Sequence, residues 1–189
     1  MEVLVAYATK HGATRGIAER IAGVLGERGC NVTLQDVDST GDLSGYAAFV
    51  VGSALYLGQW RKEALEFVRH NRLTLGDRPT WLFSSGPLRI TGKDAEADDP
   101  RAAAEATELG QMRCADELRE LVQPREHRVF FGALAPDTLG ATERLMRLMP
   151  GGRSLLPLGD FRDWDRIESW SASIADELDK VPVPSGAAV

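Results

Sequence analysis

The segment YATKHGATRGIA, residues 7–18, joins an apolar run to a helical pattern and combines two glycines with two threonines. The preceding residues 2–7 (EVLVAY) are apolar and β-branched, as in a strand that is buried on both faces. Beyond the segment, apolar residues recur at helical spacing: Ile17, Ile21, Val24 and Leu25. Gly29 is a typical helix end. The segment therefore predicts a strand, a tight loop and a helix, the first unit of a parallel α/β sheet.

Four further apolar runs are predicted to be strands: residues 31–37, 48–53, 78–85 and 127–134. Helical patterns occupy residues 61–75 and 100–122, and a last amphipathic helix has Ile167, Trp170, Ile174 and Leu178 on one side. Strands that alternate with helices predict a doubly wound five-stranded parallel sheet. Residues 90–100 (ITGKDAEADDP) are expected to be a mobile loop.

Composition limits the classes of function. The chain has 189 residues, of which 43% are hydrophobic, enough for one domain, expected over residues 1–180 with a flexible tail at 181–189. A net charge of −6 argues against a nucleic-acid partner, which would need a concentrated basic face. Cys30 and Cys114 are far apart and lack metal-ligand spacing, so neither a metal site nor a disulfide is inferred, and both are expected to be buried thiols.

No window of the sequence reaches the roughly 18 to 20 apolar residues of a membrane span. The N-terminal residues begin acidic, and their apolar stretch is too short for a signal peptide. We therefore expect a cytoplasmic protein without a transmembrane segment, at most peripheral to the inner face of a membrane.

Ligands of doubly wound sheets bind beyond the carboxyl ends of the strands. Three such ends carry small or hydroxyl residues: residues 9–14, 53–60 and 84–88. In the first, backbone N–H groups lie at the positive end of a helix dipole, and glycine permits close approach of a phosphate. Neither GxGxxG nor GxxxxGK[ST] occurs. A phosphate-accepting receiver domain is also disfavoured, because Ala8 and Thr9 follow the first strand where acidic metal ligands would be needed.

Residues 9–14 (TKHGAT) resemble the phosphate loop T-x-T-G-x-T of the flavodoxin-like family, with His11 in place of the middle threonine. The resemblance implies FMN as cofactor and a strand order of 2-1-3-4-5. Most of the chain is similar to menaquinone-dependent protoporphyrinogen oxidases and their flavodoxin-domain relatives. The segments that carry this similarity are VVGSALYLGQW (50–60), FFGAL (130–134), LMRLMPGG (145–152) and GDFRDWDRIESWSASIA (159–175).

By this resemblance, three segments form the FMN site. Their residues are Thr9, Lys10, His11, Gly12, Ala13 and Thr14; Ser53, Ala54, Leu55, Tyr56, Leu57, Gly58 and Trp60; and Ser84, Ser85, Gly86, Pro87 and Leu88. Tyr56 and Trp60 either stack on the isoalloxazine or cover the sheet edge. Residues 84–86 either donate hydrogen bonds to the pyrimidine side of the flavin or form an ordinary loop. No catalytic residue is assigned, because the flavin itself supplies the redox chemistry.

The resemblance implies oxidation of protoporphyrinogen IX, with electrons passing through FMN to a quinone. An insert follows the fifth strand in that family, and the corresponding residues 135–161 contain few aromatics. The insert carries cationic and apolar side chains: Arg144, Arg147 and Arg153, with Leu145, Met146, Leu148 and Met149. A helix of this kind either rests on a membrane or binds a propionate-bearing substrate, or its Leu145, Leu148 and Met149 pack on the domain, which is the favoured interpretation.

Three hypotheses of function remain. The first is an FMN-dependent oxidoreductase related to protoporphyrinogen oxidase, with a quinone acceptor and a porphyrinogen substrate. The second is a flavodoxin-type electron carrier with a redox partner and no organic substrate. The third is a binding domain that has lost FMN, for which His11 is the most consistent feature. The family's habits further suggest a homodimer.

Overall fold

The computed structural model describes residues 1–56, 58–86, 92–149 and 158–180. Five parallel strands form the central sheet in the order β2-β1-β3-β5-β6. They are β1 (Glu2–Ala8), β2 (Asn31–Asp36), β3 (Ala48–Tyr56), β5 (Thr80–Gly86) and β6 (Glu126–Phe131). Because a short strand takes the label β4, this order is the expected 2-1-3-4-5, and the doubly wound α/β fold is confirmed.

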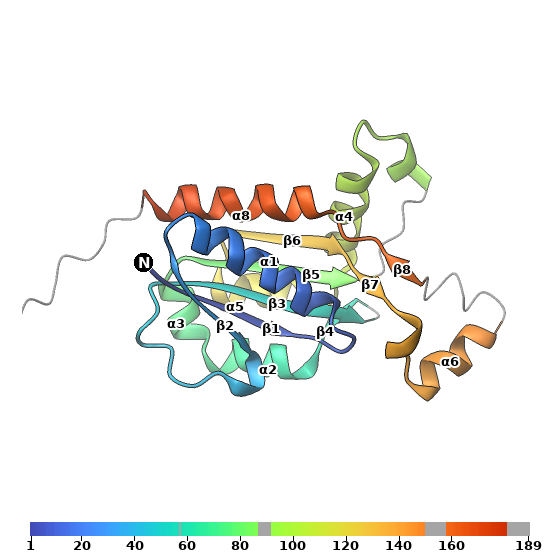
Figure 1. Ribbon diagram of the computed structural model, residues 1–189, viewed down its shortest axis with the longest axis horizontal. Helices are drawn as coiled ribbons and strands as arrows, with labels where there is room; N and C mark the ends of the chain where they lie inside the picture. The colour runs from blue at the N-terminus through green and yellow to red at the C-terminus, as the bar shows by residue number, and fades with distance from the viewer. Residues whose placement is uncertain (57, 87–91, 150–157, 181–189) are drawn as a thin grey trace, which may run out of the picture.

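Helices cover both faces of the sheet (Figure 1). On one face lie α1 (Ala13–Glu27) and α8 (Trp164–Leu178); on the other lie α2 (Lys62–His70), α3 (Arg72–Asp77) and α5 (Ala115–Val122). Side chains of β1 alternate between the two cores, so that Val3 packs with Ile17 and Ile167, whereas Leu4 packs on the α2/α5 side. Burial on both faces is the physical reason for the unbroken apolar runs.

Two predicted helices are each broken in the structure. The helix expected over residues 61–75 is divided at Asn71, whose side-chain amide donates to the Phe67 carbonyl. The helix expected over residues 100–122 is divided into α4 (Pro100–Gln111) and α5, because Met112 and Cys114 turn into the core. The junction has a structural use, since the Arg113 N–H donates to the Gly58 carbonyl.

One other expectation is corrected, and one segment expected to be a mobile loop contains a short helix. The fifth strand ends at Phe131, and β7 (Ala133–Leu134) instead pairs with β8 (Gly159–Asp160) in a separate small sheet. Part of the expected mobile loop, Gly92–Glu96, is a 3-10 helix (η2), and Thr107 on α4 donates a hydrogen bond of 2.8 Å to Asp94. Shorter 3-10 turns occur at Val37–Ser39 (η1) and Pro136–Thr138 (η3).

The helix of the insert is α6 (Ala141–Leu148), which Figure 1 shows beyond the end of the central sheet. Leu145, Leu148 and Met149 are 65%, 78% and 61% exposed, so the favoured interpretation that they pack on the domain is wrong. Within the described part of the chain, no helix combines the length and the apolar character needed to cross a bilayer. Cys114 is buried, and Cys30 is only partly so.

Several residues named from the sequence lie outside the described ranges: Leu57, Pro87, Leu88, Arg153 and the tail 181–189. The side chain of Met146 is also outside the description.

Candidate functional site

The three predicted segments begin at neighbouring positions of the sheet. Ala8 of β1 pairs with Ser53 of β3, and Ser53 pairs in turn with Ser84 of β5. Because the strands are parallel, their carboxyl ends open on the same edge. The fold therefore brings together the segments that start at Thr9, Ser53 and Ser84.

The first segment leaves the start of α1 without a side-chain cap. Gly12 is the N-cap residue, with a left-handed φ of 84°, and the first turn contains no acidic residue. The Gly12 N–H donates to Thr9 Oγ1 at 3.0 Å, and Gly16 N–H donates to the Gly12 carbonyl. Amides in the first turn of a helix have no intrahelical acceptor, and together with the helix dipole they favour an anion.

The space around this helix start fits a phosphate. A Cβ added to Gly12 would meet no heavy atom within 4 Å, so the surroundings of the loop are open there. Lys10 precedes the glycine and adds positive charge, whereas the Arg15 guanidinium pairs with Glu19 at 2.8 Å. The donor set consists of backbone amides with the Lys10 cation beside them, and the first turn holds no carboxylate, which suits a phosphate monoester.

Residues 4–149 match the family model for the flavodoxin domain. The chain belongs to the flavodoxin family. Its fold and family imply flavin binding, and of the T-x-T-G-x-T pattern the chain keeps Thr9, Gly12 and Thr14.

Individual relatives of this flavodoxin-family chain are distant. Protoporphyrinogen IX dehydrogenase [quinone] of Escherichia coli K12 is 21% identical over 187 residues, which cover 95% of this chain and 98% of that protein. Among solved structures, a flavodoxin from the domain Archaea superposes with a TM-score of 0.56 and 14% identity, covering 95% of this chain and 99% of that one. Rubredoxin oxygen:oxidoreductase of Desulfovibrio gigas has a TM-score of 0.58 and 11% identity; this chain is matched over 94% of its length but covers only 36% of that protein.

Thr14 and Ser85 form a buried contact between the first predicted segment and β5. The two hydroxyl oxygens are 2.7 Å apart, and the residues are 1% and 3% exposed. The Thr14 hydroxyl, expected from the sequence to be a donor to phosphate, is thus engaged by Ser85. Thr9 likewise uses its hydroxyl oxygen within the loop, as an acceptor for Gly12. Backbone amides of the first turn are therefore the main donors that this helix start offers to an anion.

His11 and Tyr56 form a second contact between segments. His11 Nε2 lies 2.8 Å from the Tyr56 hydroxyl, and Lys10 Nζ lies 5.0 Å from the centroid of the Tyr56 ring. Tyr56 ends β3 and pairs with Gln59 of β4 (Gln59–Trp60). The exposed Lys10 and the partly buried His11 therefore both border the one tyrosine expected to face the flavin.

Trp60 and Ser84 belong to the core rather than to a ligand surface. Trp60 is 3% exposed and its indole N–H donates to Ser84 Oγ at 2.7 Å. Ser84 Oγ also lies 2.9 Å from His127 Nε2 and 3.5 Å from Met112 Sδ. Of the two alternatives for Trp60, the structure supports the one in which it covers the sheet. Ser53 is equally buried, and its hydroxyl accepts from the Arg61 N–H.

His127 carried no functional assignment in the sequence, yet it completes this buried polar cluster. Burial lowers the pKa of His127 to about 3, and the positive charge of Arg119 contributes in the same direction. The imidazole is therefore neutral at physiological pH. His127 lies on the same face of β6 as the buried Val129 and Phe131, and this two-residue spacing was the available sequence signal for its position.

Arg162 was also missed by the sequence interpretation. A Cβ on Gly16 would lie 2.4 Å from Arg162 Nη1, so the guanidinium occupies the space that glycine leaves on α1. The guanidinium pairs with Asp160 and lies 4.4 Å from the centroid of the Trp164 ring. Glycine at position 16 therefore admits a cation beside the first turns of α1, and no local sequence pattern connects the two residues.

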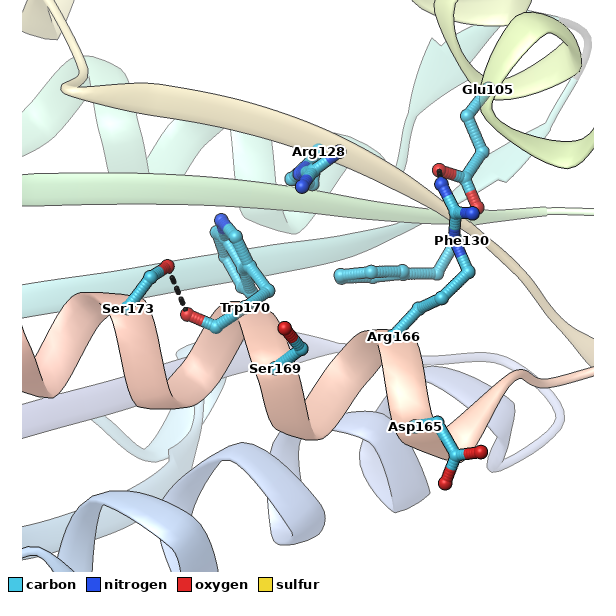
Figure 2. A pocket seen from close by; sticks show the side chains of 8 residues that line it. All are labelled: Glu105, Arg128, Phe130, Asp165, Arg166, Ser169, Trp170 and Ser173. Atoms are coloured by element: carbon cyan, nitrogen blue, oxygen red, sulfur yellow. Dashed lines mark hydrogen bonds and ion pairs between the residues drawn. The ribbon is translucent and has the colours of Figure 1, made fainter. Parts of the chain in front are cut away.

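A groove of about 430 Å³ lies elsewhere, along β6 and α8 (Figure 2). Its lining residues are Glu105, Arg128, Phe130, Asp165, Arg166, Ser169, Trp170 and Ser173. Arg166 binds Asp99 and the buried Glu105, whose pKa is raised by burial. None of the predicted cofactor residues that the structure describes lines this groove, so it is not assigned to the flavin.

Proposed function

We propose that the chain is an FMN-dependent oxidoreductase that delivers electrons to a quinone, with a porphyrinogen as the organic substrate. The uncapped start of α1 at Gly12 carries the FMN part of the proposal, because first-turn amides beside Lys10 suit a phosphate monoester. Similarity to the protoporphyrinogen IX dehydrogenase [quinone] of E. coli over nearly the full length of both chains supports the substrate and the acceptor.

The protein's part in this chemistry is to bind and orient the cofactor. Amides at the start of α1 hold the phosphate and Tyr56 contacts the ring system, whereas Ser85 and Gly86 end β5 within the sheet and support the site from below. FMN, when bound, supplies the one- and two-electron redox chemistry. The hydroxyl of Ser85 does not take part, because Thr14 already engages it.

The insert is the proposed contact with the acceptor or the substrate. Arg144 is exposed beside the apolar Leu145 and Leu148, an arrangement that suits either a membrane surface holding quinone or the propionates of a porphyrinogen. In this proposal the protein is cytoplasmic and meets the inner face of a membrane through α6.

An electron carrier of the flavodoxin type is the second candidate. The observation that favours it is the scarcity of aromatic residues in the insert, where Phe161 is the one aromatic between residues 135 and 161. Such a carrier would exchange electrons with a reductase and would act on no organic substrate.

The deciding assay follows the oxidation of protoporphyrinogen by the FMN-loaded protein, with a menaquinone analogue as acceptor. The proposal expects consumption that requires added FMN and quinone and falls when Leu145 and Leu148 are both replaced by Ser. Leu73→Ser is the matched control, because Leu73 is also 78% exposed but lies on α3. Bound FMN that is reduced and reoxidised by partner proteins, without consumption of protoporphyrinogen, would instead establish the carrier.

A further inference from the structure

The contact between His11 and Tyr56 joins two segments that are 45 residues apart in the chain. His11 Nε2 and the Tyr56 hydroxyl are 2.8 Å apart, and both residues are partly buried. The distance is that of a normal hydrogen bond, and either group has a donor and an acceptor form. A threonine at position 11, as in the family loop, carries its hydroxyl on Cβ and ends well short of the position that Nε2 takes.

The two segments are each anchored on their other side. The phosphate loop is held by Thr9 Oγ1 to the Gly12 amide and by Thr14 to Ser85. On the tyrosine side, the Gly58 carbonyl accepts a hydrogen bond of 2.8 Å from the Arg113 N–H, and Gly58 has a left-handed φ of 73°. A hydrogen bond between two anchored segments fixes the position of Tyr56 relative to the loop.

We propose that His11 is a positioning residue: it acts through the Tyr56 hydroxyl and couples the loop that holds the FMN phosphate to the tyrosine that contacts the flavin ring. The inference rests on the proposed function only in requiring that the chain binds flavin. The family loop has a threonine at position 11, whose hydroxyl can contact the phosphate. In this chain His11 gives up that contact and instead holds Tyr56 in position beside the flavin ring. His11 in this role touches neither the phosphate nor the reacting atoms.

Riboflavin separates this role from a phosphate contact, because riboflavin has the same ring system and no phosphate. If His11 positions Tyr56, His11→Ala lowers the affinity for FMN and the affinity for riboflavin by the same factor. If His11 contacts the phosphate, the variant lowers the affinity for FMN and leaves the affinity for riboflavin unchanged. Loss of one hydrogen bond at a partly buried site predicts a factor of about 3 to 10.

The experiment titrates the full chain with FMN and with riboflavin, using the quenching of flavin fluorescence. The proteins are wild type, His11→Ala, His11→Gln, Tyr56→Phe and the double variant His11→Ala/Tyr56→Phe. We expect His11→Ala and Tyr56→Phe each to lower the affinity for FMN by about 3- to 10-fold. The double variant is expected to bind FMN no more weakly than either single variant, and His11→Gln is expected to restore most of the affinity. The visible absorption bands of bound FMN are expected to change in the same way in His11→Ala and Tyr56→Phe, and to return in His11→Gln.

Additive losses in the double variant would overturn the inference, as would a loss of FMN affinity in His11→Ala with riboflavin unchanged. If riboflavin binds too weakly to titrate, the double-mutant cycle of His11→Ala and Tyr56→Phe, measured with FMN, tests the inference without it. An unchanged affinity in His11→Ala, with wild type binding FMN, overturns the role of His11 and leaves the proposed function standing. A folded wild-type chain that binds no FMN overturns both.

Discussion

The hydroxyl oxygens of Thr14 and Ser85 meet at 2.7 Å in the interior, although 71 residues separate them in the chain. Thr14 lies in the first turn of α1 and Ser85 lies at the end of β5. The contact ties the start of α1 to the adjacent sheet end, and so the amides that form the proposed anion site are held by the core. It also engages the two hydroxyls with each other inside the protein.

Thr14→Val tests this tie. The replacement keeps the side-chain shape and leaves the Ser85 hydroxyl buried without its partner, which is expected to cost about 1–3 kcal/mol of unfolding free energy. The double variant Thr14→Val/Ser85→Ala is expected to be less destabilised than the sum of the single variants, because neither partner remains unsatisfied. Urea denaturation measures all three. Equal stability of Thr14→Val and wild type would show that the contact carries no energy.

His127 makes the protein sensitive to acid. Its pKa is about 3 in the folded chain, whereas an unfolded histidine titrates near 6.5, so the unfolded state binds more protons below about pH 6.5. Stability is then fully present above pH 6.5 and is lost as the pH falls toward 3, by up to about 1.4 kcal/mol per pH unit.

His127→Gln is expected to flatten this dependence by about 1–2 kcal/mol between pH 7 and pH 5. Denaturation in urea at several pH values gives the slopes. His70→Gln is the matched control, because His70 is exposed on α2 and is expected to leave the slope unchanged. Parallel curves for wild type and His127→Gln would contradict the assignment of a neutral buried imidazole.

Ser84→Ala tests the buried cluster around Trp60. The variant removes the acceptor of the Trp60 indole N–H and the partner of His127, so a loss of about 1–3 kcal/mol in unfolding free energy is expected. The emission of Trp60 is expected to change with the loss of its hydrogen bond. Thermal and urea unfolding check the first effect, and the variant Trp60→Phe identifies the signal in the second. A fully stable Ser84→Ala protein would argue that the cluster is not bonded as described.

Leu148→Ser tests the corrected view of the insert. Because the side chain is 78% exposed, we expect a change in unfolding free energy within about 0.5 kcal/mol of zero. Leu118→Ala, at a fully buried position of α5, is expected to cost about 2–5 kcal/mol. A large loss in Leu148→Ser would restore the interpretation in which this helix packs on the domain.

The fold could be predicted from the sequence because β1, β3 and β5 are buried on both faces and leave unbroken apolar runs. The helix breaks could not, since Met112 and Cys114 are as apolar as residues of a continuing helix and turn inward only because α4 and α5 meet there. Ligand-side segments could be identified from the rule that parallel strands end on one edge.

Which residues of those segments face a ligand and which face the core depends on contacts between residues that are far apart in the sequence. His11 with Tyr56, Thr14 with Ser85 and Gly16 with Arg162 are neighbours in space only. From side-chain type alone, Thr14, Ser84 and Trp60 were all candidates for contacting the flavin. In the folded chain each of them instead has a hydrogen-bond partner inside the protein. Position along β6 was the one local clue to His127.

Calorimetric titration of the folded chain with FMN tests the central claim, that amides at the start of α1 bind the phosphate of a flavin nucleotide. Wild type and Gly29→Asp are expected to bind FMN with a measurable heat and to stay yellow after dialysis; Gly29 is the matched control, because it also has a left-handed φ (89°) and open space around an added Cβ. Gly12→Asp places a carboxylate where the phosphate is expected, and the affinity should fall by at least about tenfold. A wild-type chain that is folded, gives no heat with ample FMN and remains colourless would contradict the account.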